Sequence, residues 1–286
     1  MSKVNQDLDH LVLFVPVDPT TNLPLVPTFF TDNFTLSPGG FHADGATSNT
    51  LILLSDGCYI ELISFINPDA APTHWWGPDA SFVGWKDWCL TNSTTPESNY
   101  EGLKDSHGEP IHGGRKRADG VDVKWAVKFP KGDNGGQHVR GRIPFFCHDI
   151  TPRNIRVPLD DKKTKHACGA LGVRQLTVIT KNKIILNETR RIYTSIFGSD
   201  GITKGDEVIF SAGRVNQVRG IDGGSRITLR LPQTKEEFMQ VEESGFMYGN
   251  VVLGAENQPG KTLGTAERLD KTHGDGSVGG LWVEYV

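Results

Sequence analysis

Two apolar stretches near the N-terminus carry a polar residue among their apolar side chains, His10 in the first and Glu61 in the second, and this feature constrains the fold and the chemistry most. Residues 8–15 (LDHLVLFV) and 58–65 (CYIELISF) have the length and the side chains of β-strands. Strand side chains alternate between two faces, so His10 and Glu61 each share a face with apolar neighbours. Burying either group without a partner costs free energy. If the strands are neighbours, the two groups can pair, hold a metal ion or move a proton.

The bulk composition is that of a globular protein and argues against several classes of function. With 286 residues, the chain is long enough for one large or two ordinary domains. A net charge of −4 and a pI near 6.1 argue against a nucleic-acid-binding surface. We interpret the short basic stretch at 114–117 as a solvated turn. No apolar run reaches the length of a membrane span and no signal-peptide core precedes the first strand, so we expect no membrane association.

The four cysteines indicate the cellular compartment. Cys58, Cys89, Cys147 and Cys168 are widely spaced and form no CxxC pair. This spacing favours reduced, buried thiols in an intracellular protein over a disulfide framework. We therefore predict a cytoplasmic protein.

The chain repeats one order of elements: a strand, a helix, and then two or three strands. The strands are expected at 8–15, 34–36, 50–54, 58–65, 81–90, 110–117, 121–129, 143–148, 172–179, 207–212 and 226–231. Helices are expected at 24–33, from Thr94-Thr95-Pro96 onward, from Asn187 to Phe197 before Gly198, and at 234–244 with Thr234 and Glu237 as a capping box. Asp119-Gly120 indicates a hairpin. The pattern predicts an α+β fold of repeated βαβββ modules.

The same pattern divides the chain into four parts. We expect a module pair over 6–150 and an exposed, polar connector over 151–168. A third module of the βαββ type covers 169–232. Residues 233–286 are expected to form a C-terminal helix, a glycine-rich loop and an edge strand.

Several of these motifs, taken in order, resemble the glyoxalase-like domain family of the vicinal-oxygen-chelate superfamily. The resemblance covers residues 8–232 and is strongest in the first unit. The motifs that carry it are LDHLV at 8–12, PGGFH at 38–42, GATSN at 45–49, DGCYIELI at 56–63, Gly114-Arg115, Arg117, Asp119-Gly120, Trp125 and IPFF at 143–146.

The resemblance implies curled mixed sheets around a cup, with the helices outside and the reactive site inside. Superfamily enzymes usually place one metal ligand on the first and one on the last strand of each module. At these places the first module offers His10 and Glu61, the second offers Trp85 or Asp87 and His148 or Asp149, and the third departs, with Gln175 and with Thr228 or Arg230. The resemblance thus implies one divalent ion (Zn²⁺, Mn²⁺ or Fe²⁺), and a site without metal remains an equal alternative.

The catalytic and metal-binding candidates are His10, Glu61 and His148. Asp149 follows His148 but points to the other face of the strand, so the two are not expected to form a dyad. The alternative for His10 and Glu61 is a buried hydrogen bond that only fixes the strand register.

Three further residues are candidates for substrate binding. His42 and Asn49 follow a glycine-rich turn that could bring them to the mouth of the cup, and Trp85 could form a wall. The alternatives are an exposed loop histidine, an asparagine that pins the loop, and a tryptophan of the core.

Three functions are compatible with these residues. The first is a cytosolic enzyme that acts on a small oxygenated metabolite by isomerase, lyase or oxygenase chemistry, with or without a metal. The second is a metal-free protein that binds or sequesters a small molecule, and the third is a metal-free pericyclase or epimerase. A small-molecule substrate is the expected partner, nucleic acid and membrane are not, and a homodimer is compatible with the sequence.

Overall fold

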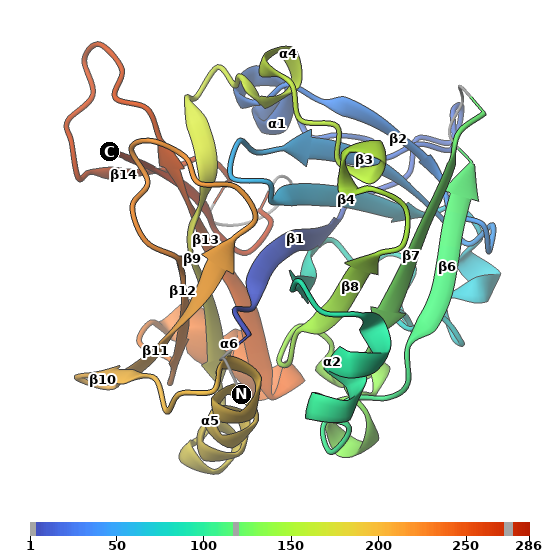
Figure 1. Ribbon diagram of the computed structural model, residues 1–286. Coiled ribbons are helices and arrows are strands. Elements are labelled where there is room, and N and C mark those ends of the chain that lie inside the picture. The colour runs from blue at the N-terminus through green and yellow to red at the C-terminus, as the bar shows by residue number, and fades with distance from the viewer. Residues whose placement is uncertain (1–3, 117–119, 272–276) are drawn as a thin grey trace.

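Strand β1 (Asp7–Phe14) is the central strand of the fold, which a computed structural model describes for residues 4–116, 120–271 and 277–286 (Figure 1). It pairs in parallel with β4 (Tyr59–Phe65) and antiparallel with β5 (Gly84–Thr91). At its start it also pairs with β11 (Glu207–Arg214), a strand of the second half of the chain. Every residue after Asp7 is buried, as the apolar run predicts.

Two βαβββ modules form a first, curved sheet, in agreement with the sequence. Its strand order is β2-β3-β4-β1-β5-β8-β7-β6. The remaining elements of the modules are α1 (Thr28–Asn33), β2 (Ser37–Phe41), β3 (Thr47–Leu53), α2 (Pro96–Leu103), β6 (Ile111–Lys116), β7 (Asp122–Lys128) and β8 (Phe145–Asp149). The Thr95 side chain caps α2 and Pro96 occupies its first turn, as predicted. The predicted hairpin residue Asp119 lies outside the described residues.

The second half of the chain forms another set of strands in the order β10-β11-β12-β9-β13-β15-β14. Its elements are β9 (Ala170–Thr180), α5 (Lys183–Phe197), β10 (Ile202–Lys204), β12 (Ser225–Arg230), α6 (Lys235–Ser244), β13 (Phe246–Ala255), β14 (Ala266–Arg268) and β15 (Leu281–Tyr285). The final strand was expected at the edge, but the short β14 lies outside it.

Of the three caps predicted for the two long helices, two are correct. Thr234 and Glu237 form the capping box of α6, and Gly198 ends α5 in a left-handed conformation with φ 61°. The start predicted for α5 at Asn187 is wrong, because Asn182 already accepts from the backbone N–H groups of Ile184 and Ile185. A second asparagine one turn into a helix gives the same local signal as the true cap.

The two faces of β1 belong to two different apolar clusters. Leu11 and Leu13 face the large core between the curved sheet, α1, α5 and the second set of strands. Val12 and Phe14 face the inside of the curved sheet, where a smaller aromatic cluster lies. The inner face of the curved sheet is thereby separated from the main core of the molecule.

The connector at 151–168 is not simply exposed, in contrast to our prediction. It contains α3 (Arg153–Arg156) and α4 (Asp161–Thr164), and the Arg156 side chain is buried. Short 3₁₀ turns elsewhere are η1 (Pro68–Ala70), η2 (Gly132–Asn134) and η3 (Gln137–Val139). The polar composition of this segment reflects ion pairs made inside the protein as well as contact with water.

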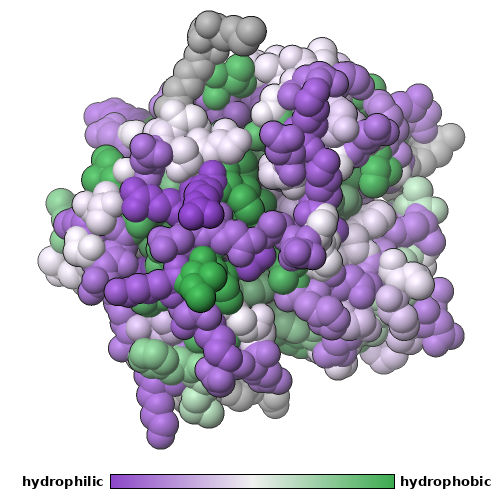
Figure 2. All heavy atoms as spheres, turned by 90° about the horizontal axis from the view of Figure 1, so that it is seen from below, coloured by the Kyte–Doolittle hydropathy of each residue, from purple (hydrophilic) through white to green (hydrophobic). Residues whose placement is uncertain are grey.

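On the face shown in Figure 2, hydrophobic residues gather in small clusters between hydrophilic ones. Within the described part of the chain, no helix has the length and apolar character needed to cross a membrane.

Candidate functional site

The inner face of the curved sheet surrounds a cavity of about 220 Å³. Polar side chains of the first module line one part of it: His10, His42, Asn49 and Glu61. Aromatic side chains line most of the rest: Tyr59, Trp75, Trp76, Trp125, Phe129 and Phe145. A largely apolar cavity with a few converging polar groups is the usual form of a small-molecule site.

His10 and Glu61 come together in this cavity, as the sequence predicts. The parallel register of β1 and β4 places Val12 opposite Glu61, so the two polar residues lie on the same inner face. His10 Nε2 is 3.5 Å from Glu61 Oε2, within the distance expected for a shared hydrogen-bond or coordination shell.

His42, in the loop after β2, and Asn49 on β3 also reach Glu61, so the structure brings four of the six candidates together. Asn49 Nδ2 donates to Glu61 Oε1 at 2.6 Å, and His42 Nε2 lies 3.4 Å from the same oxygen. The backbone N–H of Gly40 donates to Asn49 Oδ1 at 2.9 Å and thereby fixes the amide orientation. A side chain on Gly39 would overlap Asn49, which explains the glycine at that position.

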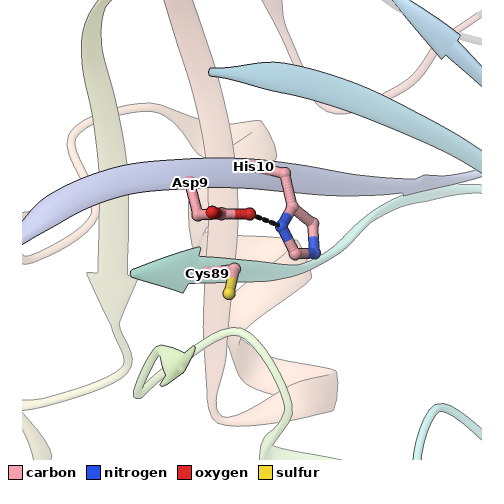
Figure 3. Close-up of side chains that lie close together, drawn as sticks. All are labelled: Asp9, His10 and Cys89. Atoms are coloured by element: carbon pink, nitrogen blue, oxygen red, sulfur yellow. Dashed lines mark hydrogen bonds and ion pairs between the residues drawn. The ribbon is translucent and has the colours of Figure 1, made fainter. Parts of the chain in front are cut away.

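Asp9 is a site residue that the sequence analysis missed. The pairing of β1 with β5 shifts register between Leu8 and His10, so Asp9 occupies a β-bulge and no longer obeys strict alternation. Its carboxylate therefore reaches the neighbouring imidazole, and Asp9 Oδ1 lies 2.5 Å from His10 Nδ1 (Figure 3). The sequence did contain a signal for Asp9, because a carboxylate next to a histidine within an apolar strand needs a partner.

Two arginines of the connector hold Asp9 in its ionised form. Arg153 Nη1 donates to Asp9 Oδ2 at 2.5 Å, and Arg156 donates to both carboxylate oxygens at 3.0 and 2.8 Å. Burial alone would raise the pKa of Asp9, but the charges of Arg153 and Arg156 and the bond from His10 hold it well below its usual value. Asp9 is therefore a permanent acceptor for His10 Nδ1.

The Asp9 carboxylate determines the tautomer of His10. It thereby determines which ring nitrogen can accept a proton or bind a cation on the cavity side. When Nδ1–H donates to Asp9, the neutral imidazole presents its Nε2 lone pair toward Glu61 Oε2. Two acceptors at 3.5 Å repel each other unless a proton or a metal cation lies between them. The ring itself is held by stacking on Tyr59, with ring centroids 4.7 Å apart.

Glu61 is a permanent negative charge in the cavity. Burial would raise its pKa, but the hydrogen bond from His42, the charges that His10 and His42 carry when protonated, and the bond from Asn49 lower it to about 2. A carboxylate with such a low pKa is a weak general base near neutral pH. It is better suited to bind a cation.

Cys89 lies close to Asp9 and His10, and the three form a possible metal-binding group (Figure 3). Two features argue against a metal at this place. Asp9 is already bonded to His10 and two arginines, and burial raises the pKa of the Cys89 thiol well above its usual value. A metal requires the thiolate. The open side of His10 is Nε2, toward Glu61.

His148 does not line the cavity, which corrects the prediction that it is the third site group. Its neighbour Cys147 faces the cavity, and His148 lies on the other face of β8, buried against Asn92 and Asn99. All four of the first residues of β8 are buried, so the sequence of this strand gives no signal for which face is inside. Burial, followed by the charge of Lys128, lowers the pKa of His148 to about 4.

The position of His148 predicts a pH-dependent stability term. The unfolded histidine takes up a proton below about pH 6.5, whereas the native one stays neutral down to about pH 4, so this contribution to stability is lost on acidification. When the pH falls from about 7 to about 5, the free energy of unfolding of wild type should therefore decrease by about 2 kcal/mol more than that of His148→Gln. Urea unfolding at both pH values measures this. The exposed His138→Gln serves as control, and a parallel pH dependence of wild type and His148→Gln would contradict the assignment.

Trp85 is also displaced from its predicted place in the wall. The register of β5 shifts between Asp87 and Trp85, and the Trp85 side chain belongs to the main core, where its Nε1 donates to Gly280 O at 3.1 Å. Trp75, Trp76 and Trp125 line the cavity instead. Trp76 is also tied to a carboxylate, because its Nε1 donates to Asp87 Oδ2 at 3.3 Å.

The metal-ligand positions expected in the second module, Trp85 or Asp87 and His148 or Asp149, do not line the cavity. Asp87 is buried beside Trp76 and does not line the cavity, and burial raises its pKa to about 6. Asp149 is bonded to Arg153 and Arg156. The inward-facing residues of β8 are Phe145 and Cys147. The polar group around Glu61 comes from the first module, with support from the connector.

Comparison with known proteins agrees with this architecture. The sequence matches the glyoxalase-like domain family over residues 8–197, which includes the whole curved sheet. The chain belongs to the glyoxalase-like domain family. The resemblance inferred from the sequence motifs is thereby confirmed, and the glyoxalase-like domain extends through α5 into the second half of the chain.

One solved structure shares the fold of this chain over most of its length. A hypothetical protein from Staphylococcus aureus matches with a TM-score of 0.64 and 13% identity, over 98% of this chain and 100% of that chain. A mutant of 4-hydroxymandelate synthase from Streptomyces coelicolor matches with a TM-score of 0.46 and 14% identity, over 88% and 72% of the two chains. Methylmalonyl-CoA epimerase from Mycobacterium tuberculosis matches with a TM-score of 0.33 and 10% identity, over 52% and 91%. No curated protein matches the sequence.

Proposed function

We propose that the protein is an enzyme that binds a small oxygenated molecule in the cavity and holds one divalent metal ion between His10 and Glu61. The observation that carries the proposal is the 3.5 Å approach of two acceptors, His10 Nε2 and Glu61 Oε2. One of them is a carboxylate that stays ionised, and the other has its proton fixed on the far nitrogen by Asp9.

The residues around this pair fit a metal ion of the first transition row. Imidazole nitrogen and carboxylate oxygen are ligands of Zn²⁺, Mn²⁺ and Fe²⁺. Asp9 behind His10 provides the carboxylate–histidine arrangement that orients metal-binding histidines, and Asn49 holds the other oxygen of Glu61. Two protein ligands leave coordination positions open for oxygens of a substrate.

The proposed reaction class is isomerase or lyase chemistry, in which a proton moves at a carbon next to an oxygen. A divalent ion bound at this site supplies a Lewis acid that polarises the substrate oxygen. His42 Nδ1 is 2.6 Å from Thr47 Oγ1, and its Nε2 faces the Glu61 carboxylate from the mouth of the cavity. His42 is therefore placed to donate or accept the proton. The four cysteines, all free and buried as predicted, support the proposed cytoplasmic location.

Metal binding by the purified full chain tests the proposal before a substrate is known. After chelator treatment, titration with Zn²⁺, Mn²⁺ or Fe²⁺ should give one ion per chain, and His10→Gln should bind it at least about 100-fold more weakly. The exposed His138→Gln should bind it like wild type. If wild type takes up no ion, the proposal fails. A metal-free binding protein, or a metal-free pericyclase or epimerase, then becomes the better interpretation.

A further inference from the structure

The second half of the cavity is an aromatic recess, in contrast to the polar first half. Phe145 faces inward on β8, and the rings of Phe129 and Phe145 stack with centroids 5.2 Å apart. The Trp75 ring continues this wall, 5.3 Å from Phe129. A planar apolar group packs against such ring faces with a gain beyond the burial of its area.

The adjoining wall on β6 and β7 is flat because a glycine faces a tryptophan. Gly113 on β6 pairs with Trp125 on β7, and a Cβ at Gly113 would lie 3.1 Å from the indole Nε1. The missing side chain lets the indole lie close to the backbone of β6. Both Gly113 and Trp125 line the cavity, which accordingly suits a flat ring.

A cation borders the cavity at its polar end. Arg115 lies two residues beyond Gly113 on β6, and its Nη1 donates to Gly39 O at 3.1 Å. The next residue, Gly40, is bonded to Asn49, which in turn holds Glu61. This chain of contacts connects the guanidinium, through Gly39, Gly40 and Asn49, to Glu61 on the same side of the cavity. A guanidinium has five N–H donors in a planar fork, so further donors can bind a carboxylate.

Arg156, the other arginine that the described residues place in the cavity, cannot take this role. Arg156 also lines the cavity, but it donates to Asp9, Asp149 and the Tyr59 hydroxyl. Its donors are used within the protein, and its charge is balanced by two carboxylates. Arg115 is therefore the cation that a ligand can engage.

We propose that the cavity selects small aromatic carboxylates, with the planar ring in the aromatic recess and the carboxylate on Arg115. The inference rests on the proposed function, because it places the substrate in the same cavity and an oxygen of that substrate at the His10–Glu61 pair. The negative charge of Glu61 next to the carboxylate is offset when a divalent ion is bound. The ligand therefore binds more tightly to the metal-loaded protein than to the chelator-treated one.

Calorimetric titration of the full chain with three probes tests this selection. Benzoate has the ring and the charge, cyclohexanecarboxylate has the charge without the flat ring, and benzamide has the flat ring without the charge. Wild type should bind benzoate about tenfold more tightly than either of the other two. Arg115→Gln should lower benzoate affinity about tenfold, to the level of benzamide, and Trp125→Leu should remove the preference over cyclohexanecarboxylate.

Matched controls are Arg219→Gln and Trp282→Leu, which remove the same side chains from positions that do not line the cavity. The inference is overturned if wild type does not bind benzoate at about 10 mM, a concentration well above the dissociation constant of most specific ligands. It is also overturned if Arg115→Gln binds benzoate as wild type does. Arg115-dependent benzoate binding by a protein that takes up no metal would sink the metal proposal and leave this inference standing. Metal uptake without benzoate binding would overturn this inference and leave the metal proposal standing.

Discussion

Glu61→Gln is expected to abolish divalent-metal binding while leaving the fold almost unchanged. Gln keeps the shape of Glu61 and an oxygen that accepts from Asn49 Nδ2, so the hydrogen bond at 2.6 Å can remain. It removes the only carboxylate that the described residues place beside His10 Nε2 inside the cavity. Without an anionic ligand, affinity for the ion should fall at least about 100-fold.

Two measurements separate a ligand role from a structural role for Glu61. Metal content and titration give the affinity, and urea unfolding without metal should give a free energy within about 1 kcal/mol of wild type. Added metal should raise the melting temperature of wild type but not of Glu61→Gln, because only a species that binds the native state stabilises it. The exposed Glu97→Gln is the charge-matched control. If Glu61→Gln unfolds and wild type never binds metal, the His10–Glu61 pair is structural.

The parts of the fold that were predictable are those with strong local signals. Apolar strands between turn residues, the capping box at Thr234 and the end of α5 at Gly198 are all set by neighbours in the sequence. The pairing of His10 with Glu61 was also predictable, because each is an ionisable residue within an apolar strand. Such a residue needs a partner, and the strand order of the repeated modules limits where the partner lies.

The rest of the site depends on contacts that no local pattern contains. The bulge at Asp9 is a property of the pairing between β1 and β5, which lie in different modules. Arg153 and Arg156 reach Asp9 from 144 and 147 residues away along the chain, and their segment has the composition of an exposed linker. In β8, Phe146 and Cys147 are both buried, so alternation could not indicate that Cys147, and not His148, faces the cavity.

Asp9→Asn is expected to cost the native state about 3–5 kcal/mol in the free energy of unfolding. Asp9 is fully buried, and it is the shared partner of Arg153, Arg156 and His10. Asn keeps the volume but removes the charge, which leaves two guanidinium groups with Asp149 as their remaining carboxylate. Removing one partner from a buried ion pair costs far more than the pair itself contributes, because the other charge stays desolvated.

The same substitution should also weaken metal binding, which links the stability of the connector to the chemistry of the cavity. Asn can still accept from His10 Nδ1–H, but it no longer holds that proton by charge, so metal affinity should fall about 10- to 100-fold. Urea unfolding and metal titration of Asp9→Asn measure the two effects on one protein, and Asp160→Asn, an exposed acid of the same connector, is the control. A loss of stability below about 1 kcal/mol would show that water or Asp149 compensates the arginines. The connector would then contribute nothing to how His10 is held, and His10 would owe its orientation to stacking on Tyr59.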